Sequence, residues 1–373
     1  MSLTRLLRCA TRDEVKSTLL HGVKGHPFVP EFDDQVRCGV APFGKSISSR
    51  LMFQYSCTRW LRSNANAFDV VLVLSSMISS LLLGEVARKR GCPVVCRIEN
   101  STQGLAPRPW YARLRDIDAN RYKILSRMNA VIAKSSLVEA ELSIGGVDKR
   151  RIARIPQHCD TEHFSIASVD ERHEWKQRLG WPRRFTFLFV GEVVHRKRPL
   201  LLIECLSDMV KRGLDVQLAL VGPMSDVEYG RAILREVQKH RLEERVLWNG
   251  FNRLIKVFYH AADAFVLPST NECMPSSLIE AMASGLPSIV SEFAGSTDVV
   301  EHGKCGWIVP MGDGERDVWV DQMQSAVRRV GDPSLGERAR EIVVERMDSR
   351  VVWPQYLEVL RGAAHEGGWN ASA

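Results

Sequence analysis

Short apolar runs alternate with amphipathic stretches along this chain, and the clearest case lies in its second half. Residues 264–269 form an apolar run that predicts a buried strand ending in a loop, and residues 286–290 predict the next strand. Between them, Pro275 suits a first helical position and Gly285 suits a helix end. The pattern therefore predicts strand, loop, helix and strand, with the helix over residues 275–284.

Two carboxylates flank the start of this predicted helix. Glu272 precedes it and Glu280 lies within it, roughly 7 Å along the axis at 1.5 Å per residue. The free N–H groups near Ser276 and Ser277 point back toward the Glu272 loop, and a helix N-terminus is an anion site. An anion bound there would have a carboxylate on each side, and each carboxylate can accept hydrogen bonds from hydroxyl groups. A nucleotide sugar has groups in this order: the sugar, the diphosphate and the ribose. Taken alone, such a pair is also typical of surface carboxylates beside a crossover helix.

Further segments follow in a fixed order between residues 187 and 310. They are Phe187-Leu-Phe-Val-Gly191 with Lys197 six residues after the glycine, Leu218-Ala-Leu-Val-Gly222, Val246-Leu-Trp-Asn-Gly250-Phe251, and the stretches 261–269, 293–298 and 303–309. With the Glu272 to Glu280 segment, this ordered set resembles the nucleotide-binding domain of family 4 glycosyltransferases. The resemblance implies the GT-B fold, an α/β architecture of two Rossmann-like domains facing each other across a cleft.

The resemblance also implies how the second domain would bind a nucleotide sugar, with UDP- and GDP-sugars as the first choices. Glu272 would hold hydroxyls of the donor sugar, and Glu280 those of the ribose. Lys197 would stabilise the negative charge of the leaving diphosphate. The catalytic candidates are therefore Glu272 and Lys197. The donor-binding candidates are Gly191, Arg196, Lys197, Gly222, Gly250, Phe251, Glu272, Met274, Pro275, Ser276, Ser277 and Glu280.

The first half of the chain resembles the family more loosely. The similar segments are residues 68–74, 91–95, 130–135 and 155–164. This domain would bind the acceptor, with Glu99 and Asn100 as candidate residues. Glu99 stands where many family members have a histidine that meets the donor sugar. Glu192 stands where the family often has an arginine, and it would repel a diphosphate unless it turns away.

The expected reaction is transfer of a hexosyl group from a nucleotide sugar to the hydroxyl of a glycan, a lipid-linked acceptor or a natural product. Retention at the anomeric carbon, and no need for a metal or a further cofactor, are what the resemblance implies. A GT-B protein that binds the nucleotide sugar without turnover is the main alternative, because Glu99 departs from the pattern on the acceptor side.

A second alternative is a P-loop phosphotransferase, because Gly39 to Ser46 satisfies the G-x4-G-K-S pattern. Its context argues against it. Residues 33–38 are too polar for the buried strand that leads into such a loop, and Pro42 removes one N–H of the phosphate cradle. No convincing downstream strand ends in an aspartate that could hold magnesium.

Length and composition fit a two-domain enzyme. At 373 residues, the chain is longer than a single hydrophobic core usually supports. Its contents of 45% hydrophobic and 25% charged residues are ordinary for a globular protein. We expect an acceptor domain over residues 1–161, a donor domain over 162–350, and a C-terminal helix over 351–373 that packs back on the first domain. Nine cysteines without a C-x2-C pair indicate reduced thiols and no zinc site.

The apolar stretch 70–83 contains four serines, so it is too short and too polar to span a bilayer. The first ten residues do not have the apolar core of a signal peptide, so we expect a cytoplasmic protein. The net charge of +7 leaves membrane association open, through contact with anionic lipid or a lipid diphosphate acceptor. Residues 110–123 are the candidate surface, and no nucleic-acid partner is expected.

Overall fold

The computed structural model of this chain describes residues 16–21, 34–37, 47–75, 77–99, 117–293 and 295–365. The chain divides into two compact units: unit 1 comprises Met1–Pro156 and Ser349–Ala373, and unit 2 comprises Gln157–Asp348. The sequence placed these divisions after residues 161 and 350. The predicted P-loop segment Gly39–Ser46, the acceptor candidate Asn100 and residues 110–116 all lie outside the described ranges.

Unit 1 contains a four-stranded parallel sheet in the order β3-β4-β5-β6. Its strands are β3 (Val71–Val73), β4 (Val94–Arg97), β5 (Ala130–Ala133) and β6 (Ile152–Arg154). Its helices are α2 (Ile47–Asn64), α3 (Ile78–Arg88), α5 (Ile117–Leu125), α6 (Ser136–Ile144) and α15 (Ser349–Ala364), with 3-10 turns η1 (Ala65–Ala67) and η2 (Lys149–Arg151). A separate parallel pair joins β1 (Thr18–His21) and β2 (Asp34–Arg37).

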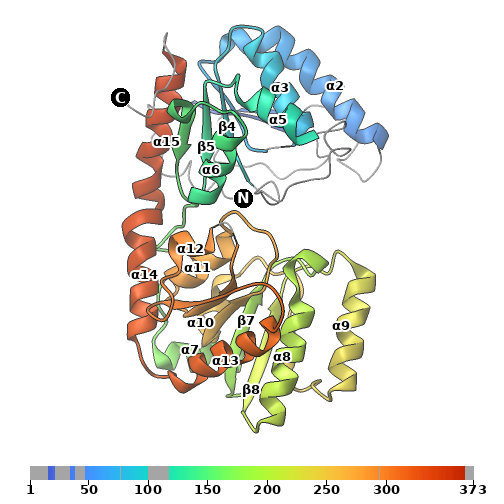
Figure 1. The fold of residues 1–373 in the computed structure, drawn as a ribbon, viewed down its shortest axis with the longest axis vertical. Helices are drawn as coiled ribbons and strands as arrows, with labels where there is room; N and C mark the ends of the chain where they lie inside the picture. The colour runs from blue at the N-terminus through green and yellow to red at the C-terminus, as the bar shows by residue number, and fades with distance from the viewer. Residues whose placement is uncertain are drawn as a thin grey trace. The chain divides into compact units, whose positions relative to one another are not determined.

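The last helix of the chain, α15, belongs to unit 1, where it packs against the sheet. Trp353 and Tyr356 of α15 share a buried apolar cluster with Val95 of β4 and Ile132 of β5. The helix runs alongside this sheet (Figure 1). Each side chain of this size contributes roughly 1.5–3 kcal/mol when it is fully buried. The C-terminal segment therefore completes the core of unit 1.

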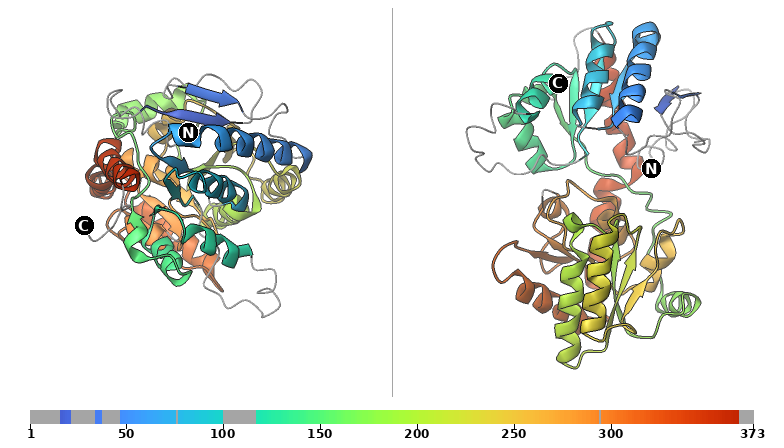
Figure 2. Two further views of the ribbon diagram at one scale, coloured as in Figure 1. Left: turned by 90° about the horizontal axis from the view of Figure 1, so that it is seen from above. Right: turned by 90° about the vertical axis from the view of Figure 1, so that its right-hand side faces the viewer.

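Unit 2 is built around a six-stranded parallel sheet in the order β12-β11-β10-β7-β8-β9. Its strands are β7 (Phe185–Val190), β8 (Val216–Val221), β9 (Val246–Trp248), β10 (Ala264–Leu267), β11 (Ser288–Ser291) and β12 (Gly306–Val309). Its helices are α7 (Val169–Arg178), α8 (Pro199–Lys211), α9 (Val227–Lys239), α10 (Lys256–Ala261), α11 (Ser276–Ala283), α12 (Ser296–Val299), α13 (Glu315–Arg328) and α14 (Ser334–Met347), with the 3-10 turn η3 (His195–Lys197). Helices cover both faces of this sheet (Figures 1 and 2).

The strand order of unit 2 reverses at β7. From β7 the chain adds β8 and β9 on one side of the sheet, then crosses back and adds β10, β11 and β12 on the other. In open parallel sheets, the crevice beyond the carboxyl ends of two strands at such a reversal is where ligands bind. The topology therefore singles out the loops that follow β7 and β10.

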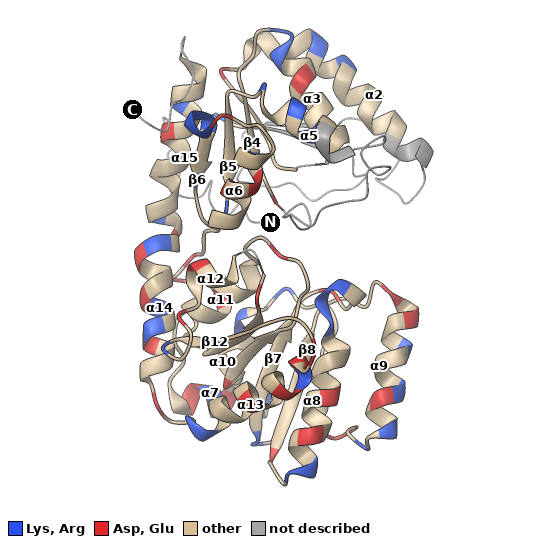
Figure 3. Ribbon diagram, in the orientation of Figure 1, with Lys and Arg blue, Asp and Glu red and all other residues tan. Residues whose placement is uncertain are grey.

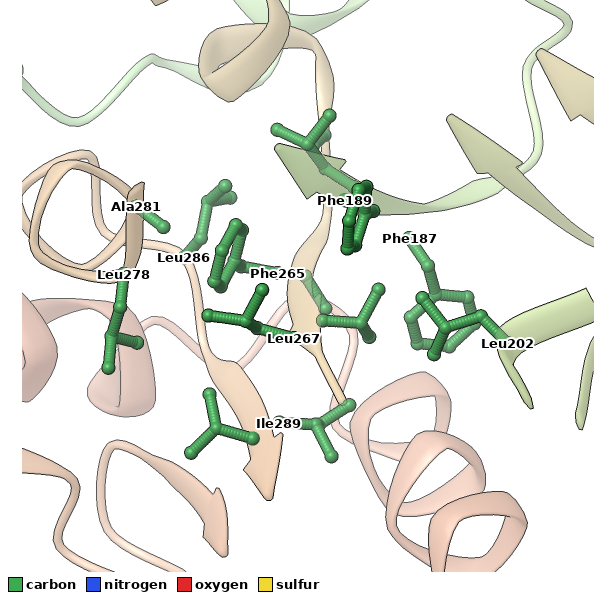
Figure 4. Packing of buried hydrophobic residues seen from close by; sticks show 14 of the residues in the cluster. Phe187, Phe189, Leu202, Phe265, Leu267, Leu278, Ala281, Leu286 and Ile289 are labelled. Carbon is green, nitrogen blue, oxygen red and sulfur yellow. The ribbon is translucent and has the colours of Figure 1, made fainter. Parts of the chain in front are cut away.

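The core of unit 2 holds these loops in place. Phe187 and Phe189 of β7 and Phe265 of β10 are fully buried, together with Leu278 on the inner face of α11 (Figure 4). Because α11 buries this face against the sheet, its N-terminus is fixed at the carboxyl edge, directly after the β10 loop.

The predicted helix over residues 275–284 spans Ser276–Ala283 in the structure, so one expectation was wrong. Pro275 is not the first helical residue but the residue before it, with an extended backbone (φ −71°, ψ 134°). Its carbonyl oxygen accepts the first helical hydrogen bond, from the N–H of Leu278 at 3.1 Å. At the other end Gly285 has a φ of +72°, the left-handed conformation that glycine adopts without strain.

Candidate functional site at the carboxyl edge of unit 2

The loops after β7 and β10 meet through one carboxylate. Lys197 Nζ lies 2.8 Å from Glu272 Oε1, and Arg196 Nη1 donates to the same oxygen at 2.5 Å. Arg196 also donates to the carbonyl oxygen of Asn271 at 2.6 Å, and Ser269 Oγ lies 3.3 Å from Glu272 Oε1. Residues 75 positions apart in sequence are thus held together at the topological reversal.

The electrostatics of this cluster favour an ionised carboxylate. Glu272 and Lys197 are largely buried, whereas the Arg196 side chain is 41% exposed. Burial alone would raise the pKa of Glu272, but the ammonium of Lys197 and the guanidinium of Arg196 outweigh it and hold the pKa below its usual range. The cluster carries two positive charges and one negative charge.

Glycines bring the strand ends close together at this edge. Gly222 follows β8 with a φ of +148°, and a Cβ atom there would lie 1.9 Å from the carbonyl oxygen of Gly191. A Cβ on Gly191 would lie 2.9 Å from Cδ of Lys197. The N–H of Gly222 donates to the carbonyl oxygen of Gly250 at 2.7 Å. Gly191, Gly222 and Gly250 therefore present backbone without side chains at this edge, and Lys197 packs against Gly191.

The N-terminus of α11 lies beside this cluster. Ser276 and Ser277 are half-buried, and among the described residues no side chain caps this end of the helix. The preceding residues are tightly packed, because a Cβ on Gly295 would lie 1.8 Å from the carbonyl oxygen of Cys273. Met274 is buried, with its sulfur 3.2 Å from the backbone nitrogen of Gln157. The free N–H groups of α11 are thus presented on a rigid loop.

Glu280, the second predicted carboxylate, has a partner that the sequence analysis missed. Tyr259 of α10 is 1% exposed, and its hydroxyl lies 3.0 Å from Glu280 Oε2 and 3.2 Å from the carbonyl oxygen of Ser277. The sequence signal was weak, because a tyrosine before an apolar strand is usually a core residue.

Phe251 follows β9 and its side chain is 65% exposed. It stands at the same edge of the sheet as Gly250, with an aromatic face accessible to solvent. Glu192 is also exposed.

The basic residues within 195–198 point to different partners. Arg198 adopts a left-handed conformation (φ 50°), and its guanidinium binds both carboxylate oxygens of Glu315 at 2.8 and 2.9 Å. Arg198 is therefore committed to α13, while Arg196 and Lys197 remain at the site.

Unit 1 contains a second carboxylate cluster, at the carboxyl edge of its own sheet. Lys134 Nζ donates to Glu99 Oε2 at 2.9 Å, and Arg97 Nε lies 3.0 Å from Glu99 Oε1. Both cations are almost fully buried. Burial would raise the pKa of Glu99, but Lys134 and Arg97 hold it below its usual range. Lys134 and Arg97 were not anticipated from the sequence.

Neither metal binding nor membrane insertion has an evident structural basis in the described part of the chain. Among these residues, no group of three or more histidine, cysteine or acidic side chains is arranged to hold a metal ion. Within the same ranges, every helix falls short of the length and apolarity needed to cross a bilayer.

Comparison with known proteins identifies the second unit. Residues 171–329 match the family model of glycosyl transferases group 1. The chain is 31% identical over 195 residues to the UDP-Gal:alpha-D-GlcNAc-diphosphoundecaprenol alpha-1,3-galactosyltransferase of Escherichia coli, covering 51% of this chain and 47% of that protein. It is 33% identical over 147 residues to the N-acetyl-alpha-D-glucosaminyl L-malate synthase of Bacillus anthracis, covering 38% and 36%. The matches span less than half the length of these two relatives.

Solved structures resemble the whole chain. The structure of Anabaena Alr3699/HepE in complex with UDP and glucose superposes with a TM-score of 0.75 at 18% identity, covering 96% of this chain and 95% of that one. Sucrose-phosphate synthase from Thermosynechococcus elongatus gives 0.73 at 22% identity, covering 93% and 88%. At these identities the likeness establishes the fold alone. The α/β, GT-B prediction is confirmed, and residues 171–329 of this chain form a domain that matches glycosyl transferases group 1.

Proposed function

We propose that this protein transfers a hexosyl group from a UDP-sugar to an acceptor hydroxyl. The observation that carries the proposal is the cluster of Lys197, Arg196 and Glu272 at the topological reversal of a group 1 domain. UDP is proposed because the Escherichia coli relative is a UDP-Gal galactosyltransferase and the Anabaena structures contain UDP or UDP-glucose. No further cofactor is required by this reaction.

The chemical demand of the reaction is to stabilise the leaving diphosphate. The bond from the anomeric carbon to the diphosphate breaks, a bond to the acceptor oxygen forms, and the acceptor proton is released with UDP. Lys197, Arg196 and the N–H groups of Ser276 and Ser277 would meet the developing negative charge. Because these groups are fixed before the donor arrives, little reorganisation accompanies the reaction.

Glu272 would have a different part. Its oxygen Oε1 contacts Lys197, Arg196 and Ser269, whereas no side chain of the described residues donates a hydrogen bond to Oε2. An ionised oxygen with open lone pairs accepts hydrogen bonds from hydroxyl groups. We therefore assign Oε2 to the hydroxyls of the donor sugar.

The remaining donor contacts lie along the same edge. Glu280, oriented by Tyr259, would accept hydrogen bonds from the ribose hydroxyls. Phe251 offers an exposed aromatic face on which the base could stack. Gly191, Gly222 and Gly250 would let the nucleotide approach the backbone closely.

On the acceptor side, we propose that Glu99 receives the attacking hydroxyl group. Its side chain is 36% exposed while Lys134 and Arg97 are buried, so the carboxylate is the accessible part of that cluster. The acceptor class is a glycan or a lipid-linked sugar, in keeping with the Escherichia coli relative. Retention at the anomeric carbon and independence of metal belong to the proposal as well.

The test is a panel of UDP-, GDP-, ADP- and dTDP-sugars, scored first by thermal shift and then by transfer to a membrane extract and to free glycans in the presence of EDTA. Lys197→Ala should abolish both UDP binding and transfer. Lys211→Ala, on the exposed end of α8, is the matched control and should leave both unchanged. Product NMR then reports the anomeric configuration.

Three outcomes would contradict the proposal. Binding of UDP-sugars without transfer or hydrolysis would favour a non-catalytic GT-B protein. Magnesium-dependent hydrolysis of a nucleoside triphosphate that Lys45→Ala abolishes would favour the P-loop reading. Loss of activity in EDTA, restored by a divalent metal, would refute metal independence.

A further inference from the structure

The N-terminal halves of α2 and α3 form an exposed apolar surface in unit 1. Among the described residues of this unit, eight large hydrophobic side chains are exposed. Five of them lie on α2 or at the start of α3: Leu51, Met52, Tyr55, Met77 and Leu82. Leu51, Tyr55 and Met77 are each more than 60% exposed. We call these five residues the α2–α3 patch.

The patch is continuous across the two helices. Gln54 of α2 donates through Nε2 to the carbonyl oxygen of Ser79 in α3 at 2.9 Å, which joins the two helices beside the exposed residues. α2 buries Cys57 and Leu61 on its inner face, so Leu51 and Tyr55, four residues apart, stand on the outer face. An amphipathic surface helix normally shows polar residues there, and here it shows apolar ones.

The charge of α2 indicates what would cover this patch. Its 18 residues contain Arg50, Arg59 and Arg62 but no aspartate and no glutamate. Arg59 and Arg62 are exposed and follow Tyr55 at helical spacing. In Figure 3 the described part of α2 carries the colour of basic residues and none of the colour of acidic ones. A helix with exposed leucine, methionine and tyrosine and only positive charges is suited to lie in the interface of an anionic bilayer.

The position of the patch in unit 1 matches the proposed acceptor edge. α3 connects β3 to β4 within a parallel sheet, so it starts at the carboxyl ends of the strands. Glu99 follows β4 at that same edge. An acceptor held in the bilayer by a lipid would reach the edge at which its hydroxyl is needed.

We propose that the α2–α3 patch docks unit 1 on the surface of an anionic phospholipid bilayer. The inference deepens the proposed function, on which its account of the acceptor rests, and it places membrane contact on α2 and α3 rather than on residues 110–123. Leu51, Met52 and Tyr55 enter the interface, and Arg59 and Arg62 meet the anionic headgroups.

The experiment is co-sedimentation of the full chain with vesicles of phosphatidylcholine and phosphatidylglycerol in equal parts, compared with phosphatidylcholine alone. The protein should bind the anionic vesicles, and binding should weaken as salt is raised. The double variant L51E/Y55E should lose about tenfold or more of this binding. R59Q/R62Q should lose about fivefold for each arginine at low salt, with less effect at high salt.

The matched control is V227E/L234E, which adds the same two charges at exposed positions of α9 in unit 2. It should bind vesicles like the parent protein. Thermal denaturation and UDP binding by L51E/Y55E report whether the variant is folded. Lys197→Ala should keep vesicle binding even if it loses UDP, which separates failure of this inference from failure of the transferase proposal.

Two results would overturn the inference. The first is that the parent protein binds neither kind of vesicle, or that V227E/L234E loses binding as much as L51E/Y55E does. The second is concentration-dependent self-association that L51E/Y55E abolishes without any effect of lipid, because the patch would then be an interface between two copies of the chain.

Discussion

The two units each hold a carboxylate between two cations at the carboxyl edge of a parallel sheet, yet they expose opposite parts of the cluster. In unit 2, Glu272 is 9% exposed and Arg196 is 41% exposed. In unit 1, Glu99 is 36% exposed, while Arg97 is 1% exposed. An incoming molecule therefore meets a cation in unit 2 and a carboxylate in unit 1. The first suits a diphosphate and the second suits a hydroxyl.

The difference has a structural origin. Arg196 and Lys197 belong to a loop after β7, and the carboxylate that they contact comes from the β10 loop, where its side chain is 9% exposed. Arg97 is the last residue of β4 and Lys134 directly follows β5, so both side chains start inside unit 1 and the carboxylate covers them. Two clusters of the same composition can thus serve different substrate groups, and each prediction below tests that contrast.

The largest effect is expected for Glu272→Gln. Transfer should fall by about 100-fold or more, the loss typical of removing one polar group that meets the transition state. UDP should bind at least as tightly as to the parent protein, because Lys197 and Arg196 no longer share their charge with a carboxylate. Isothermal titration with UDP and initial-rate kinetics measure the two quantities. Equal loss of UDP binding and of transfer would contradict the division of labour between Oε1 and Oε2.

Glu99→Gln should act on the acceptor only. We expect the KM for the acceptor to rise by about tenfold, as for loss of a hydrogen bond to a charged group, with UDP affinity unchanged. Glu139→Gln, on the exposed side of α6, is a matched control that should leave both constants as they are. If Glu99→Gln weakened UDP binding instead, the contrast between the units would be wrong.

Arg196→Ala should weaken UDP binding by about tenfold, because the variant loses the exposed cation of the cluster. Glu192 adjoins Gly191, on which Lys197 lies, so an arginine there could reach the same anion. The double variant Glu192→Arg/Arg196→Ala should therefore recover most of the lost affinity. An unrecovered affinity, with an unchanged melting temperature, would mean that Arg196 acts by holding the Asn271 carbonyl oxygen and not by its charge.

Tyr259→Phe should produce a smaller change. Loss of the hydroxyl that orients Glu280 should raise the KM for a ribose-containing donor by about fivefold. A donor with 2′-deoxyribose should show little of this increase, because it lacks one of the hydroxyls that Glu280 would hold. The same increase for both donors would indicate that Tyr259 serves the packing of α10 and α11 alone.

The smallest effect is the pH dependence of stability. The pKa values of Glu272 and Glu99 are lowered in the folded protein by their cations. Their contribution to the free energy of unfolding is therefore complete above the pKa of an unfolded glutamate and is lost as the pH falls through the lowered value. Urea unfolding between neutral and acidic pH should show a shallower decline for Glu272→Gln than for the parent protein. A parallel decline would show that Glu272 does not contribute.

Much of the candidate site in unit 2 could be anticipated from sequence. The loop glycines, Lys197 and the carboxylate pair each lie next to a recognisable strand or helix signal, because local pattern determines local structure. The end of α11 was also predictable, because Gly285 marks it in the sequence and adopts the left-handed conformation in the structure. The position of Pro275 did not, because a proline suits both the residue before a helix and its first turn, and only the first helical hydrogen bond distinguishes them.

Other residues could not be anticipated because their partners are remote in the chain. Tyr259 reads as an ordinary core residue until α10 packs beside α11 and its hydroxyl reaches Glu280. Arg198 belongs to the same basic run as Arg196, and only the structure shows that its backbone is left-handed and that its side chain binds Glu315. Lys134 and Arg97 read as isolated cations within strand ends, and they meet Glu99 only because β4 and β5 are adjacent.

The sequence by itself determined the alternation of strands and helices, the resemblance to glycosyltransferases and the choice of candidate residues for a donor, because these depend on spacing over a few turns of chain. Only the tertiary structure decided which charges meet and which of them face solvent. Lys197 and Glu272 form one cluster because β10 pairs with β7 and not with its sequence neighbour β9. The strength of their interaction depends on burial, which no local pattern specifies.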